Sequence, residues 1–104
     1  IWVKFKMVNV LVTVKYPPHK TEEVIKVYTS GKAAEYPDFV KRKFQWATPN
    51  YDVKIYNVYD IQDEKLVEGL KAIAKRFSTY VKVEGYKYNV EVLIEGAEAL
   101  KMMR

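Results

Sequence analysis

Residues 7–16 read MVNVLVTVKY, and this stretch decides the fold of the chain. Valine recurs at every second position from Val8 to Val14. An alternation of period two with β-branched residues is typical of a strand that buries one face. Pro17 and Pro18 follow, and neither can donate a hydrogen bond to a neighbouring strand. The sequence therefore predicts a strand over 8–16 whose valines face a core.

The next element is predicted to be a helix. Thr21 followed by two glutamates is typical of a helix start, where a hydroxyl caps the first turn and acids favour the positive end of the dipole. The helical spacing continues through Gly31 to about Ala34, and Tyr36-Pro37-Asp38 ends it. We expect this helix to depend on packing, because Gly31 and the β-branched residues weaken it.

A second helix has the clearest pattern in the chain. Its apolar residues recur at spacings of four, three and four, which places them in one stripe. Asp60 and Asp63 precede it, and we interpret both as candidates for its N-cap, with the choice between them left open. The residues of the stripe are Leu66, Leu70, Ile73 and Phe77. Alternation predicts further strands over 39–48, 51–59 and 86–94, and a short helix over 97–103.

The order of these elements, βαββαβ, predicts the fold class. Pro49-Asn50 is a turn pair, so the strands on either side of it are antiparallel. We expect a single α+β domain over 1–104 of ferredoxin-like type, a four-stranded antiparallel sheet with two helices on one face. Residues 1–6 are interpreted as an extension ahead of a natural start at Met7. The predicted helix-covered positions are Val8, Val10, Val12, Val14, Val53, Ile55, Val90, Val92 and Ile94.

The opposite face of this sheet is expected to be mixed in character. Leu11, Val58 and Leu93 are apolar enough to mark an interface if no helix covers them. Strand 39–48 has no clear inward side, because apolar and basic residues occur in both of its phases. The other residues predicted on the face are Asn9, Thr13, Tyr56, Asn89 and Glu91.

Composition excludes or disfavours several kinds of functional site. The chain has 104 residues, a net charge of +5 and no cysteine, which excludes disulfides and thiolate metal sites. It has one histidine, so no metal cofactor is expected, and a cytoplasmic location is the simpler interpretation. No stretch approaches the roughly 18 apolar residues that a membrane helix requires. Lysines are scattered apart from the group at 41–43, which favours a solvated surface over a dedicated polyanion site.

Three runs of sequence carry a resemblance to a known superfamily. They are EGYKYNVEV at 84–92, AEAL at 97–100 and VKYPP at 14–18. With the element order, they resemble small uncharacterised prokaryotic proteins of the dimeric α/β-barrel superfamily, in which two ferredoxin-like subunits pack sheet against sheet. Better-known members include haem-degrading monooxygenases, quinol-forming monooxygenases and chlorite dismutase-like enzymes. No motif here matches any of them, so the resemblance implies a homodimer but no catalytic residue or cofactor.

These observations lead to a homodimer that binds a small organic ligand between its two sheets. The predicted ligand-binding residues are Asn9, Leu11, Thr13, Trp46, Tyr56 and Leu93. If the ligand is transformed, Glu91 or His19 is the expected proton-transfer residue. A packed interface without a cavity, and a small monooxygenase-like enzyme, stay open as alternatives.

A single-stranded nucleic-acid-binding module is the main rival prediction. Phe44 and Trp46 lie on the strand that carries the basic residues at 41–43. Basic side chains interleaved with aromatic ones can bind single-stranded nucleic acid. The RNA-recognition motif shares the element order but displays aromatics on strands one and three. The first strand here has no aromatic on its open side, so nucleic-acid binding ranks below a dimer with a ligand pocket.

Overall fold

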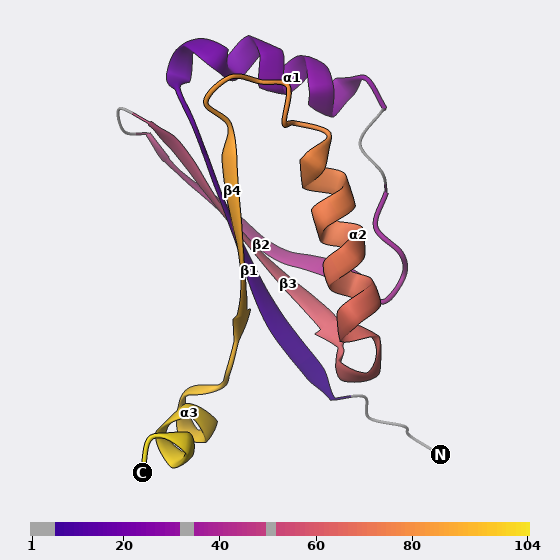
Figure 1. Ribbon diagram of the computed structural model, residues 1–104, viewed down its shortest axis with the longest axis vertical. Helices are drawn as coiled ribbons and strands as arrows, with labels where there is room; N and C mark the ends of the chain where they lie inside the picture. Colours follow the sequence, from indigo (N-terminus) through magenta and orange to yellow (C-terminus); the bar gives the residue numbers. More distant parts are fainter. Residues whose placement is uncertain (1–5, 32–34, 50–51) are drawn as a thin grey trace.

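The computed structural model describes residues 6–31, 35–49 and 52–104 (Figure 1). Residues 1–5 of the expected extension and the turn residue Asn50 lie outside this part. No helix among the described residues is both long and apolar enough to cross a membrane. The elements are β1 (Met7–Tyr16), η1 (Pro18–Lys20), α1 (Thr21–Thr29), β2 (Val40–Pro49), β3 (Val53–Gln62), η2 (Asp63–Lys65), α2 (Leu66–Ser78), β4 (Lys87–Leu93) and α3 (Gly96–Met102).

The four strands form one antiparallel sheet in the order β2-β3-β1-β4. The predicted α+β class and the four-stranded antiparallel sheet are therefore confirmed. β3 lies between β1 and β2, and β1 lies between β3 and β4. Each strand–helix–strand unit thus has a strand of the other unit inserted into it.

One apolar core joins the sheet to both long helices. The valines of β1 at positions 10, 12 and 14 are buried, as predicted, together with Ile73 and Phe77 of α2. Val24 of α1 packs against the same cluster, so α1 and α2 cover the same face of the sheet (Figure 1). Val92 and Ile94 are exposed, contrary to the expectation for this face. β4 is an edge strand, and Ile94 lies beyond its last residue.

The end of α1 and the role of Thr21 differ from the prediction. α1 ends at Thr29, because Gly31 adopts a left-handed conformation with φ of 73° that closes the helix. Residues 32–34, where its end was expected, lie outside the described residues. The Thr21 hydroxyl donates to the carbonyl of Pro18 at 2.7 Å and caps no backbone N–H.

The capping role predicted for Asp60 and Asp63 is also wrong. β3 continues to Gln62, because Asp60 pairs with Asn9 and Ile61 pairs with Val8 on the long central strand. Asp63 opens η2, and no side chain caps η2 or α2. Pairing with β1 therefore extends β3 through residues that the local sequence suggested as the start of a helix.

A β-bulge in β2 settles the direction of its side chains. Arg42 pairs with Tyr59, and Phe44 pairs with the very next residue of β3, Val58. Lys43 is therefore an extra residue in the strand, and the alternation changes phase there. Arg42 shares the helix-covered face with buried Tyr59, whereas Phe44 faces the opposite side.

Candidate functional site

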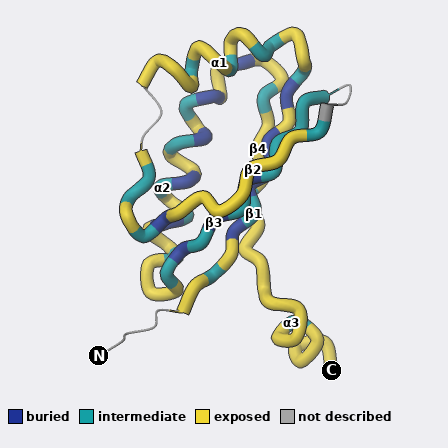
Figure 2. The backbone as a smooth tube through the Cα atoms, turned by 180° about the vertical axis from the view of Figure 1, so that it is seen from behind, coloured by how far each residue is buried: buried dark blue, intermediate teal, exposed yellow. Residues whose placement is uncertain are grey.

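All six predicted ligand-binding residues lie on the sheet face that no described helix covers. We call this the open face. On β1 its residues alternate with the buried valines, and the pairing places Trp46 beside Tyr56 and Tyr56 beside Thr13. Figure 2 shows β2 exposed along most of its length. The open face includes Asn9, Leu11, Thr13, Phe44, Trp46, Lys54, Tyr56, Val58, Asp60, Asn89, Glu91 and Leu93.

Aromatic rings and lysines gather at the β2 side of the open face. The rings of Phe44 and Trp46 stack with their centroids 5.0 Å apart, and Trp46 is 60% exposed. The Lys43 Nζ lies 5.8 Å from the Phe44 ring centroid, and the Lys54 Nζ lies 5.2 Å from that of Tyr56. Both distances fit cation–π interactions. This part of the face offers flat apolar surface within reach of positive charge.

Polar contacts tie the rest of the open face together. Asn9 of β1 donates a hydrogen bond from Nδ2 to the Asp60 carboxylate of β3. Lys43 also approaches Asp60, with 3.9 Å between nitrogen and oxygen. On β4, Asn89 donates to the Glu91 carboxylate at 3.2 Å. Glu91 is exposed on this face.

The structure does not bring the two expected proton-transfer residues together on the sheet. Glu91 lies on β4, whereas His19 lies in η1, exposed, at the start of α1. In the described part of the chain, no three His, Asp or Glu side chains gather closely enough to hold a metal ion. Of the two, Glu91 is the residue that shares a surface with the predicted ligand-binding side chains.

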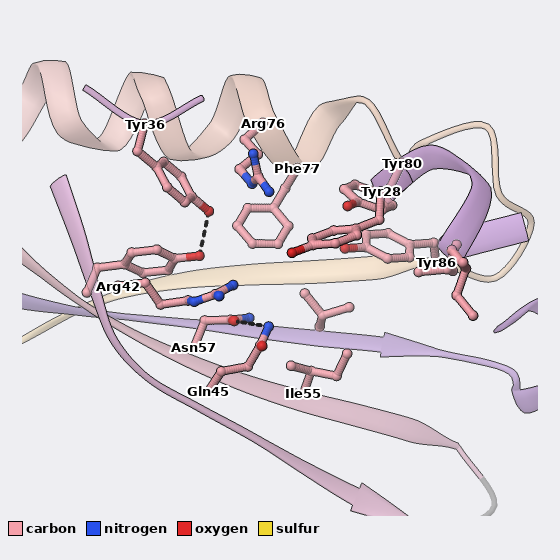
Figure 3. A pocket seen from close by; sticks show the side chains of 14 residues that line it. Tyr28, Tyr36, Arg42, Gln45, Ile55, Asn57, Arg76, Phe77, Tyr80 and Tyr86 are labelled. Atoms are coloured by element: carbon pink, nitrogen blue, oxygen red, sulfur yellow. Dashed lines mark hydrogen bonds between the residues drawn. The ribbon is translucent and has the colours of Figure 1, made fainter. Parts of the chain in front are cut away.

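A separate cavity of about 150 Å³ lies between the helices and the sheet. We call it the helix-side pocket. Figure 3 shows Arg76 of α2 entering it from the helix layer and Arg42 of β2 entering it from the sheet. Asn57 of β3 and Gln45 of β2 lie on the sheet side of the same space. Phe77, Tyr80 and Tyr86 supply ring surface around it.

The polar groups of the helix-side pocket form two hydrogen-bonded pairs. The hydroxyls of Tyr36 and Tyr59 lie 2.6 Å apart, and the Arg76 guanidinium carbon lies 4.8 Å from the Tyr36 ring centroid. Gln45 donates from Nε2 to the Asn57 side-chain oxygen at 2.9 Å. Asn57 in turn donates to the backbone carbonyl of Val12 at 3.4 Å. The pocket therefore has a built polar lining within an apolar layer.

The tyrosines of this pocket keep their protons well above neutral pH. Burial raises the pKa of Tyr59, and the hydrogen bond with Tyr36 raises it further. Burial also raises the pKa of Tyr36, against the lowering effects of the Tyr59 hydrogen bond and the positive charges of Arg76 and Arg42. Burial likewise raises the pKa of Tyr80 and of Tyr86. Each phenol is thus neutral at neutral pH and keeps a hydroxyl proton to donate.

Sequence reasoning did not predict the helix-side pocket. The position of Arg76 near the end of its helix is already explained by the helix dipole, and that of Tyr36 by a helix end. The sequence of β3 contained one indication of the pocket. Asn57 is a polar residue among the inward-facing positions of this strand, between the apolar Ile55 and Tyr59. A polar residue in that phase indicates a hydrogen-bonded partner inside the domain.

No protein-family model matches the chain, and searches of curated proteins and of solved structures return no match.

Proposed function

We propose that this protein works as a homodimer whose subunits face each other through their open faces, and that a small, partly apolar organic ligand binds between the two sheets. Each subunit would then be a ferredoxin-like half of a dimeric α/β barrel. The strand order β2-β3-β1-β4 supports this arrangement. The observation that carries the proposal is the apolar centre of the open face, where Leu11 and Val58 pair beside Phe44.

The free energy available from covering this face is substantial. Phe44 is 45% exposed and Trp46 is 60% exposed. Burying the exposed half of one aromatic side chain stabilises an assembly by about 2–3 kcal/mol, from its area and the usual value per unit area. Every such residue contributes twice in a symmetric dimer, because both copies present the same patch.

The C-terminal helix provides a second reason for a second copy of the chain. α3 contains seven residues and stands apart from the layers of sheet and helices (Figures 1 and 2). Leu100, Met102 and Met103 are exposed by 63%, 71% and 75%. Isolated helices shorter than roughly 12–15 residues are marginal in water. A partner subunit in sheet-to-sheet contact supplies the apolar surface that α3 lacks in its own subunit.

The composition of the open face supports a ligand between the sheets. Ligand pockets are mostly apolar with a few convergent polar groups. Leu11, Tyr56 and Leu93 supply the apolar part here, and Asn9 and Thr13 the polar part. Under a second sheet the Glu91 carboxylate would line the ligand space, where a carboxylate serves as a proton acceptor. Turnover of the ligand would therefore depend on Glu91.

Light scattering on the purified chain tests the dimer. We expect twice the mass of one chain for the wild type and one chain mass for Leu11→Glu, because each subunit would then bury an unpaired carboxylate in the interface. Val67→Glu is the matched control, since Val67 is exposed on α2 and lies outside the open face. It should stay dimeric. A monomeric wild type would contradict the proposal, and circular dichroism shows whether Leu11→Glu is still folded.

The stacked Phe44 and Trp46 rings favour a second candidate function, the binding of single-stranded nucleic acid. Bases stack on exposed aromatic rings, and Lys43 and Lys54 lie close enough to contact phosphates. This platform lies on β2 and β3, so it differs from the strand-one and strand-three pattern of the RNA-recognition motif. A monomer that binds a single-stranded RNA with submicromolar affinity, and loses it in Lys41→Glu/Lys43→Glu, would replace the dimer proposal.

A further inference from the structure

We propose that the helix-side pocket is a second ligand site, independent of the open face, which binds a small organic carboxylate that carries a single ring. The convergence of two guanidinium groups, from Arg42 and Arg76, on a cavity of about 150 Å³ with aromatic walls carries this proposal.

The two arginines reach the cavity from different layers of the fold. Arg42 belongs to β2, and the bulge at Lys43 leaves it on the helix-covered side, paired with Tyr59. Arg76 lies in the last turn of α2. Figure 3 shows both head groups directed into the space between α2 and the sheet. A guanidinium presents a planar fork of donors that matches the two oxygens of a carboxylate.

The charge of the lining selects an anion. None of the described residues that line the pocket is acidic, and two of them are arginines. The positive charges of Arg76 and Arg42 both act on Tyr36, and on its hydrogen-bonded partner Tyr59. Both guanidinium charges thus act at the phenol pair, where a bound carboxylate would meet them.

Neutral donors complete the anion-binding side. Only one of the Tyr36 and Tyr59 hydroxyls donates to the other, so the pair keeps one proton for a third group. Gln45 uses one amide hydrogen on Asn57 and keeps the second. A carboxylate between the arginines can therefore also accept from a phenol or an amide on the sheet side.

The remaining walls set the size and shape of the ligand. Ile55, Phe77, Tyr80 and Tyr86 offer apolar and aromatic surface, with Tyr80 and Tyr86 stacked at a centroid distance of 4.8 Å. Cavities of about 150 Å³ accept one benzene-sized ring. Inorganic phosphate would leave this surface uncovered, whereas a single ring covers it. A one-ring carboxylate satisfies both the charged and the apolar parts.

An NMR titration of the full chain with benzoate tests the proposal. The side-chain amides of Asn57 and Gln45 report on the helix-side pocket, whereas those of Asn9 and Asn89 report on the open face. We expect benzoate to shift the first pair and leave the second pair in place. Benzamide, the neutral isostere, should bind at least about tenfold more weakly because it lacks the charge that the arginines recognise. Acetate and inorganic phosphate should also bind more weakly than benzoate.

Single substitutions then locate the charge recognition. We expect Arg42→Gln and Arg76→Gln each to weaken benzoate binding by roughly 10- to 100-fold, the range for losing hydrogen bonds to a charged group. Arg104→Gln, at the exposed end of the chain, is the matched control and should bind as the wild type does. Arg42 is exposed, so its replacement leaves the core in place and keeps the test valid if Arg76→Gln unfolds.

Three results would overturn the proposal. They are unshifted Asn57 and Gln45 signals at tens of millimolar benzoate, equal affinity for benzoate and benzamide, and tighter binding of phosphate than of benzoate. Shifts confined to Asn9 and Asn89 would also reject it and would favour a ligand on the open face instead. A monomeric mass in light scattering contradicts the proposed dimer but leaves this site untouched, so the two proposals fail separately.

Discussion

Gln45 on β2 donates a hydrogen bond from its side-chain amide to the side-chain oxygen of Asn57 on β3, at a distance of 2.9 Å. Asn57 is only 2% exposed and faces the helices between Ile55 and Tyr59. A neutral amide pair thus interrupts the apolar layer at the point where the bulge in β2 ends. The pair is both part of the core and the sheet side of the helix-side pocket.

This pair predicts an asymmetry between two alanine substitutions. Asn57→Ala should lower the free energy of unfolding by about 1–3 kcal/mol, because it removes a buried side chain together with its hydrogen bonds to Gln45 and to the carbonyl of buried Val12. Gln45→Ala should cost less than about 1 kcal/mol, since Gln45 is exposed and water can replace its amide. Urea denaturation measures both values. Equal losses would show that the hydrogen bond, and not the burial of Asn57, decides the cost.

Gly69 provides a prediction about the contact between α2 and the sheet. A Cβ atom there would lie 2.7 Å from Cγ2 and 2.9 Å from Cδ1 of the buried Ile61. Gly69→Ala should therefore destabilise the protein by a net amount of about 1–2 kcal/mol, despite the better helix propensity of alanine. Gly96→Ala is the control, because a Cβ there meets no atom of the described residues within 4 Å. Thermal melts in which both variants behave alike would contradict the close packing at Gly69.

The buried tyrosines predict a loss of stability at alkaline pH. Burial raises the pKa of Tyr59 and of Tyr86 in the folded protein, so the native state keeps protons that the unfolded chain releases above pH ~10. Stability is complete below this pH and falls as pH rises further. Each tyrosine held neutral contributes a slope of about 1.4 kcal/mol per pH unit.

Urea denaturation across the alkaline range, combined with phenolate absorbance, measures this dependence. Tyr59→Phe should show a shallower slope than the wild type, because its unfolding at alkaline pH releases one proton fewer. The folded protein should show fewer ionised phenols than the unfolded chain at the same pH. A slope in Tyr59→Phe equal to that of the wild type would mean that Tyr59 titrates normally in the native state.

Trp46 provides an optical measure of the proposed dimer. It is exposed on the open face of the single subunit and would be covered by a partner sheet. In a Trp2→Phe background, its emission should shift to the red as the protein is diluted below the dissociation constant. Emission that is independent of concentration over the range where light scattering reports a dimer would exclude Trp46 from the interface.

The strongest local patterns predicted the strands and the main helix correctly. The alternation of valines in β1 identified its buried side, and the stripe through Ile73 and Phe77 identified α2. The role of Asp60 was missed because β1 is long enough to pair with β3 as far as Gln62. Capping signals are local, whereas strand length depends on a partner that is distant in sequence.

The open face was largely predictable, but the helix-side pocket was not. Simple alternation in two strands is enough to place Leu11 and Tyr56 on the same side of the sheet. The side-chain direction of Arg42 depends on the bulge at Lys43, and no residue pattern in the sequence predicts this bulge. Arg76 and Tyr59 belong to elements that only the strand order brings together. A site whose residues come from both the sheet and the helices is therefore not found by a search for sequence motifs.

The bulge in β2 also affects how the protein behaves when it is crowded. β2 and β4 form the two edges of the sheet, and an edge strand offers unpaired N–H and C=O groups to any extended chain nearby. The irregular pairing at Lys43 and the charge of Lys41 interrupt this row on β2. Sideways addition of further strands, the route to fibrils, is thereby discouraged on the edge strand that carries the exposed Phe44 and Trp46 rings. The face proposed to bind one partner sheet is thus bounded by an edge that disfavours the addition of further strands.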